Sequence, residues 1–158
     1  PEVNVTYTNY FFYKQNILYK LGDFDPILTP RKLYRKNLVG LSSVLGQSEI
    51  FKTHNFPHIR RRQDYGLWLK LINNNVKFEG INSPLLVYNP GNLKSRLSSN
   101  KLKLLPYNFY ALKVYGNAGI LKAIYYLIFN VYNSLKKNTS SKVQSLRIKE
   151  TIESRQEY

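Results

Sequence analysis

The acidic side chains that could perform general acid–base chemistry are few and widely spaced. The stretch 26–149 contains three carboxylates, which are Glu49, Asp64 and Glu79. Asp64 follows three consecutive arginines at 60–62 and stands where an amphipathic segment begins. A helix N-terminus and neighbouring guanidinium groups both favour an ionised carboxylate. Asp64 is therefore the candidate general base, although an aspartate in a first helical turn is also a common cap or dipole partner.

The element that must position Asp64 is the clearest helix in the sequence. Leu67, Trp68, Leu71 and Ile72 recur at i, i+1, i+4 and i+5, which forms one apolar stripe at helical spacing. Three asparagines at 73–75 follow and are typical of a helix end. The pattern predicts a helix over Gln63–Asn73.

The remaining segments predict a mixture of strands and helices. Turn residues and apolar periodicity separate them. We expect strands at Val3–Tyr13, Val76–Ile81 and Leu85–Tyr88, with a turn at 82–84, and a buried strand or its approach at Gly40–Leu45. We expect a loop at Lys20–Pro30 and helices at Arg31–Lys36, Ser48–His54, Leu97–Gly116 and Ile120–Lys137, followed by a polar tail that frays or forms an isolated helix. The expected fold class is α/β.

The sequence offers no convincing metal ligands. Asp23-Phe24-Asp25 has the carboxylates that a hard cation prefers, but it sits in a Gly- and Pro-containing loop and is interpreted as a coincidence. His54 and His58 are separated by Pro57, and no cysteine or acid completes a zinc set. We expect this chain to hold no metal ion.

The charge balance predicts a polyanionic neighbour. The chain has 24 basic and 9 acidic residues, a formal net charge of +15. Nucleic acid, a nucleotide diphosphate or an anionic membrane surface would each suit this charge. The 14 tyrosines and 8 phenylalanines would also suit stacking on single-stranded nucleic acid. A basic nucleic-acid-binding module therefore stays open as an alternative, although it leaves the region around Asp64 unexplained.

The segment 62–71, RQDYGLWLKL, resembles the (Glu)-Asp-Tyr-x-Leu-Trp-(Leu)-(Arg/Lys)-Leu block of bacterial family 2 glycosyltransferases. Three other segments resemble family segments in the same order, namely Val5–Tyr10, Asn37–Leu45 and Leu85–Lys101. The likeness extends over roughly 3–116. Gln63 departs from the family's usual Glu, which removes one negative charge beside the candidate base.

The resemblance implies an inverting transfer of sugar from a nucleotide-sugar donor to a glycan or lipid-linked acceptor in cell-surface polysaccharide synthesis. It implies the second half of a GT-A-type domain, with Asp64 as the catalytic base. The substrate-binding residues that it implies are Ser42, Ser43, Arg61, Arg62, Gln63 and Trp68. The expected division is 1–116 for the transferase part, 117–138 for an apolar helix and 139–158 for a charged tail.

The resemblance also implies a nucleotide-binding half and a divalent metal, Mn or Mg, in the complete enzyme. Position 1 is Pro and the chain contains no Met, which is typical of a fragment. We therefore expect the chain alone to be inactive, and a non-catalytic remnant is a further alternative. The lack of cysteine fits a cytoplasmic location. We expect no nucleic-acid partner.

The apolar stretch Ile120–Leu135 raises the question of a membrane. It contains Lys122 and is followed by two further lysines at 136–137. It is shorter than the roughly 20 apolar residues that cross a bilayer. Two interpretations stay open: an interfacial helix at the anionic inner face of the membrane, or a helix packed on its own domain.

Overall fold

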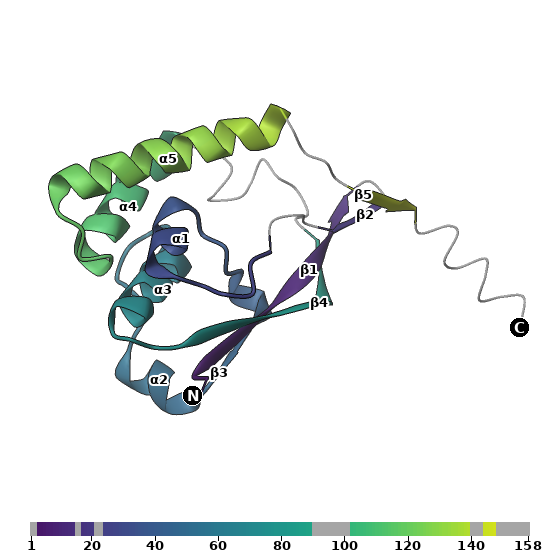
Figure 1. Ribbon diagram of the computed structural model, residues 1–158, viewed down its shortest axis with the longest axis horizontal. Coiled ribbons are helices and arrows are strands. Elements are labelled where there is room, and N and C mark those ends of the chain that lie inside the picture. The colour runs from purple at the N-terminus through teal and green to yellow at the C-terminus, as the bar shows by residue number, and fades with distance from the viewer. Residues whose placement is uncertain (1–2, 15–16, 21–23, 90–101, 140–143, 148–158) are drawn as a thin grey trace, which may run out of the picture.

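A computed structural model of the protein describes residues 3–14, 17–20, 24–89, 102–139 and 144–147. These residues form a mixed sheet with helices α1, α3, α4 and α5 gathered on one side of it (Figure 1). The expected α/β class is confirmed.

Strand β1 (Val5–Lys14) is the centre of the sheet. Thr6 pairs with Leu45 of the antiparallel strand β3 (Val44–Gly46) and with Glu79 of the parallel strand β4 (Phe78–Tyr88). These two strands therefore lie on opposite edges of β1. Strand β2 (Ile17–Lys20) pairs antiparallel with the other half of β1, on the edge of β3. The predicted first strand is confirmed.

Strand β4 corrects the prediction of two strands separated by a turn. It runs without interruption through Asn82, Ser83 and Pro84, and its pairing with β1 shifts register there. The shift is a bulge, a site where an extra residue and a proline are both tolerated in a strand. The continuous pairing partner β1 keeps the segment extended, and this partner is not visible in the local turn residues.

Helix α3 (Gln63–Asn73) has the predicted bounds and forms the middle of the core. Leu67, Trp68 and Leu71 are fully buried. The helix ends in a Schellman motif: Asn75 has a left-handed φ of 60°, and Val76 N donates to Leu71 O at 3.1 Å. The asparagine run therefore ends the helix as predicted.

The other helices match their predicted positions closely. Tyr34 ties α1 to the rest of the layer, since its hydroxyl lies 2.8 Å from Asn73 Oδ1 and 2.6 Å from Gly116 O and donates its one proton to either acceptor. The helical elements are α1 (Pro30–Arg35), α2 (Ser48–Thr53), α4 (Leu105–Tyr110) and α5 (Ile120–Thr139), with 3₁₀ turns at Leu41–Ser43 and Leu102–Leu104 and a π-helical turn at Ala111–Tyr115. The predicted start of the fourth helix near Ser98 lies outside the described residues.

Two further segments differ from the prediction. The segment 40–45 is a 3₁₀ turn that leads into β3, as the predicted approach to a strand, but it is not buried, since Leu41 and Leu45 are exposed. The predicted polar tail contains strand β5 (Gln144–Arg147), which pairs antiparallel with β2. The partner of β5 lies far away in the sequence, so local composition could not indicate that strand.

Tyr7 on β1 predicts a loss of stability in alkaline solution. Its side chain is buried, and its hydroxyl donates to Asp25 O. Burial first, and the Asp25 carboxylate second, raise the pKa of Tyr7 from 10.0 to about 12. The unfolded chain therefore loses this proton first, so the stabilisation is complete below pH 10 and is lost as pH rises to about 12. We expect the Tyr7 contribution to fall by about 2–3 kcal/mol over this window.

Urea unfolding at several pH values, compared between the wild type and Tyr7→Phe, measures this contribution. The free energy of unfolding of the wild type should decrease more steeply above pH 10. Tyr132→Phe, at a tyrosine that is 58% exposed, is the matched control and should follow the wild type. Parallel curves for wild type and Tyr7→Phe would show that Tyr7 ionises alike in both states.

Candidate functional site

Asp64 lines a cavity of about 330 Å³ between the sheet and the start of α3. This volume is at the small end of the roughly 300–1,000 Å³ of ligand pockets. The lining is mixed in character, with an acid, a guanidinium group, hydroxyls and two aromatic rings. The residues that line this Asp64 cavity are Tyr10, Asn37, Leu38, Val39, Gly40, Leu41, Ser42, Ser43, Arg62, Asp64, Leu86 and Tyr88.

The Asp64 carboxylate is half-buried and is held from one side by Asn37. Asn37 Nδ2 donates to Asp64 Oδ2 at 3.2 Å, and Asn37 Oδ1 accepts from Val39 N at 3.3 Å. Asp64 is the second residue of α3, where the helix dipole favours its negative charge. The N-cap position belongs to Arg62, which makes no side-chain cap hydrogen bond. Asp64 is thus oriented by a side chain from another segment and is not the N-cap.

Arg62 has an unusual backbone for its residue type. Its φ of 63° and ψ of 28° are in the left-handed region, which non-glycine residues adopt only at a cost of about 1–3 kcal/mol. Burial lowers the pKa of its guanidinium group, while the charge of Asp64 opposes that shift. A strained, half-buried arginine beside a carboxylate is typical of functional sites rather than of stable loops.

The segment 39–43 forms one wall and is fixed from behind. Trp68 Nε1 donates to Val39 O at 3.2 Å, and Ser43 Oγ donates to Gly40 O at 2.8 Å. Trp68 is completely buried against Phe78, with the ring centroids 6.1 Å apart. The tryptophan of the family-like block therefore positions the cavity wall from the core side.

The opposite wall comes from the sheet. Tyr10 of β1 and Tyr88 of β4 lie edge to face, with their ring centroids 5.9 Å apart. Burial raises the pKa of Tyr10. Aromatic side chains with a polar tip suit ligands that present both apolar faces and hydroxyl groups.

The structure brings together four of the residues implied by the resemblance. Ser42, Ser43, Arg62 and Asp64 line the cavity. The other three do not line it: Gln63 is exposed, Arg61 is half-buried beside Arg62, and Trp68 lies in the core.

Sequence reasoning did not single out Asn37, Tyr10 and Tyr88 as site residues. Asn37 orients the candidate base, and the two tyrosines form the sheet-side wall. Each lies within a segment that resembles the family, so membership of those segments was the available signal. Tyr10 and Tyr88 come together in this wall because β1 pairs with β4.

The described residues do not form a site that fits a divalent metal ion. Within them, no three His, Cys, Asp or Glu side chains come together. Asp25 forms an ion pair with Lys32 at 2.6 Å and accepts a hydrogen bond from Ile27 N at 3.1 Å. The Lys32 hydrogen bond, with a smaller contribution from Ile27 N, keeps the pKa of Asp25 below its usual value. Asp23 lies outside the described part of the chain.

No protein-family model, curated protein or solved structure matches this chain. The geometry of the Asp64 cavity and the sequence motifs therefore carry the functional argument.

Proposed function

We propose that this chain is the acceptor-side part of an inverting glycosyltransferase of the GT-A type, with Asp64 as the general base. The observation that carries the proposal is the position of Asp64. Its carboxylate lies in a cavity lined by serine hydroxyls, tyrosine rings and Arg62, and Asn37 fixes one of its oxygens. The resemblance of 62–71 to the family block supports the same role.

The proposed step needs one proton acceptor in this chain. An acceptor hydroxyl in the Asp64 cavity gives its proton to the carboxylate while its oxygen bonds to the anomeric carbon of the donor. The bond from that carbon to the nucleotide diphosphate breaks on the opposite side, so the configuration inverts and the electron pair leaves with the diphosphate. A positioned base contributes roughly 10²–10⁴-fold to such a rate.

The surface of β4 supports packing against a donor-binding part. Leu85 and Val87 alternate along β4 and are 69% and 54% exposed. In the described part of the chain, the outer edge of β4 has one bridge, between Ile27 and Glu79. An open strand edge with exposed apolar side chains is a surface that proteins normally cover. A nucleotide-binding part that continues the sheet here would cover it.

A chimera tests the proposed function. Residues 3–139 are joined to the nucleotide-binding half of a related family 2 glycosyltransferase. We expect the chimera to bind the nucleotide sugar and to hydrolyse it slowly, with water in the place of the acceptor. An NMR spectrum of the freshly released sugar should show the anomer opposite to that of the nucleotide-sugar donor. A folded, donor-binding chimera that hydrolyses no faster than the donor half alone would contradict the proposal.

We further propose that α5 contacts an anionic membrane surface. Ala123 and Tyr126 on one face of α5 are buried, whereas Leu121 and Ile128 on the other face are 84% and 63% exposed. Within the described residues, no helix combines the length and the apolar composition needed to cross a bilayer. An exposed apolar face with basic neighbours is typical of a helix that lies in the interface.

A further inference from the structure

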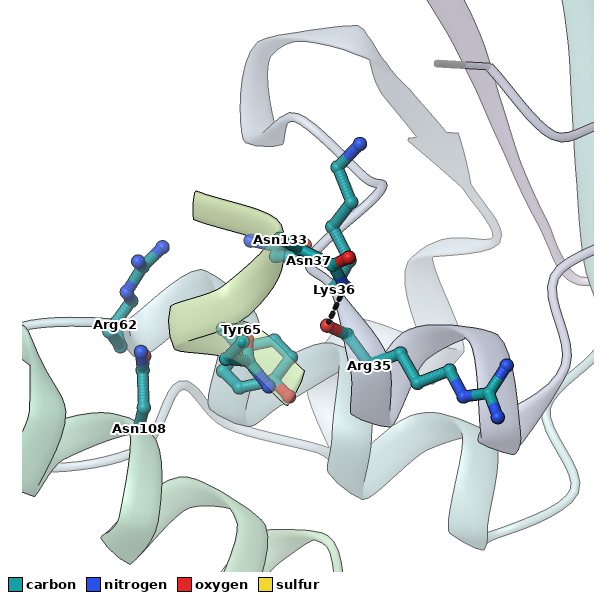
Figure 2. A pocket seen from close by; sticks show the side chains of 8 residues that line it. Arg35, Lys36, Asn37, Arg62, Tyr65, Asn108 and Asn133 are labelled. Carbon is teal, nitrogen blue, oxygen red and sulfur yellow. Dashed lines mark hydrogen bonds between the residues drawn. The ribbon is translucent and has the colours of Figure 1, made fainter. Parts of the chain in front are cut away.

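A second cavity, of about 190 Å³, lies on the other side of Arg62 from Asp64. It is enclosed by the end of α1, the start of α3, α4 and α5 (Figure 2). Asn37 and Arg62 line both cavities, so the two cavities adjoin. We name the second cavity the asparagine cavity, because four of its lining residues are asparagines. The residues that line it are Arg35, Lys36, Asn37, Arg62, Tyr65, Asn108, Asn130 and Asn133.

Hydrogen bonds to the backbone hold the walls of the asparagine cavity in place. Asn130 Nδ2 donates to Tyr34 O at 2.9 Å and to Tyr126 O at 2.7 Å. The Tyr65 hydroxyl donates to Tyr34 O at 3.3 Å, and the Tyr65 side chain is 1% exposed. The cavity is therefore a preformed feature between packed helices rather than a gap between loops.

Three buried polar atoms of the residues that line the cavity have no partner in the described part of the chain. They are the donors Arg35 Nε and Arg62 Nε and the acceptor Asn108 Oδ1. Asn108 is 6% exposed, and its side chain points from α4 toward Arg62 (Figure 2). An unsatisfied buried polar group costs about 1–3 kcal/mol, so such atoms call for an explanation.

The buried Nε of Arg35 differs from that of Arg62, because the Arg35 side chain is directed elsewhere. Its guanidinium carbon lies 4.8 Å from the centre of the Phe129 ring. The guanidinium group points away from Arg62 and Asn108 (Figure 2). Arg62 Nε and Asn108 Oδ1 are therefore the unsatisfied donor and acceptor that one ligand would contact in this cavity.

The chemistry of this pair selects a hydroxyl group. An oxygen that satisfies both atoms must accept from an N–H and donate to an amide oxygen, which a hydroxyl does. A sulfate or carboxylate could accept from Arg62, but at neutral pH it has no proton to give to Asn108 Oδ1. A single water molecule also has both functions, yet it occupies only about 30 Å³ of liquid volume. The remaining space suits a larger polyhydroxyl ligand.

The geometry points to the asparagine cavity as a binding site for a sugar unit of a glycan acceptor, next to the unit that reacts at Asp64. This inference rests on the proposed function for the identity of the acceptor. Because Asn37 and Arg62 line both cavities, the two cavities adjoin, and neighbouring units of one glycan would occupy them. Arg62 then links recognition of the distal sugar to the site of the base.

NMR titration of the ¹⁵N-labelled full chain tests the inference at the atom concerned. The Nε–H cross-peak of Arg62 is assigned from its disappearance in Arg62→Lys. The probes are the methyl glycosides of glucose, galactose and N-acetylglucosamine, with sulfate as the competing chemistry. We expect at least one glycoside to shift the Arg62 cross-peak saturably at millimolar concentration, and sulfate to leave it unchanged.

Asn108→Leu separates binding from folding. Leucine has a similar volume and removes an unsatisfied acceptor, so the melting temperature should stay the same or rise. Glycoside affinity should fall at least about tenfold, since the donated hydrogen bond is lost. Asn82→Leu, at an exposed asparagine on β4, is the matched control and should keep the affinity.

The outcomes distinguish this inference from the proposed function. No glycoside-induced shift, an equal shift in Asn108→Leu, or a saturable shift with sulfate alone would each overturn the cavity assignment. The titration needs neither donor nor turnover. Glycoside binding by a chain whose chimera transfers no sugar would leave the cavity a sugar site and remove only its role as an acceptor site.

Discussion

Replacing Asp64 with asparagine is expected to lower the turnover of the chimeric transferase by at least about 100-fold. Asparagine has nearly the same size but cannot take the proton of the attacking hydroxyl. Its side-chain oxygen can still accept from Asn37 Nδ2, the hydrogen bond that the wild-type carboxylate accepts at 3.2 Å. Only the negative charge is removed. The α3 dipole and Arg62 favour that charge, so the free energy of unfolding should fall by about 1 kcal/mol or less.

Donor affinity and stability show whether the loss is catalytic. Turnover is followed as inverted product per unit time, donor binding by calorimetry, and stability by urea unfolding. Donor binding should be largely kept, because Asp64 acts on the acceptor side. Glu79→Gln is the matched control, since it removes a carboxylate that is exposed on β4. Near-normal turnover in a folded Asp64→Asn chimera would leave Asp64 with a structural role only.

The pair of substitutions Leu121→Glu and Ile128→Glu is expected to weaken binding to anionic vesicles by at least about tenfold. Among the side chains of α5 that the structure describes, these are the most exposed apolar ones, and they point away from the buried Ala123 and Tyr126. Full burial of one such side chain contributes about 1.5–3 kcal/mol, and an interfacial helix buries part of that area. Each new glutamate also repels the anionic lipid headgroups.

Co-sedimentation with vesicles that contain phosphatidylglycerol measures the effect, and vesicles of neutral lipid show the share that depends on charge. The matched control is Leu85→Glu with Val87→Glu, which removes two exposed apolar side chains from β4 instead. Removal of α5 itself is a poorer test, since it would also remove buried core residues. An equal loss of vesicle binding in both double variants would show nonspecific adsorption rather than docking through α5.

Helix α3 and the location of the candidate base could be predicted from the sequence. The apolar stripe of α3 is a local pattern, and the asparagine run fixes its end through a left-handed residue. The first strand, α1, α2 and α5 follow from equally local signals. In these segments each residue's preference and its tertiary environment agree, so propensity and periodicity are sufficient.

Strand pairing could not be predicted in the same way. The residues Asn82, Ser83 and Pro84 favour a turn by themselves, yet pairing with β1 keeps them in one bulged strand. The segment that became β5 is polar and has no local strand signal, and its partner β2 is more than a hundred residues away. Sheet structure depends on such distant partners more than helix structure does.

A carboxylate at the start of an amphipathic helix, beside arginines, could be predicted from the sequence alone. The residues that surround this carboxylate depend on tertiary packing. Tyr10 and Tyr88 line the Asp64 cavity together because β1 and β4 pair, and Asn37 donates to Asp64 from the segment after α1. Asn108 lines the cavity next to Arg62 because α4 packs beside α5. Trp68, which the family block suggested as a contact, lies in the core because its face of α3 is the most apolar one. A local pattern fixes the direction of a side chain on its own helix, whereas the identity of its neighbours depends on how distant segments pack.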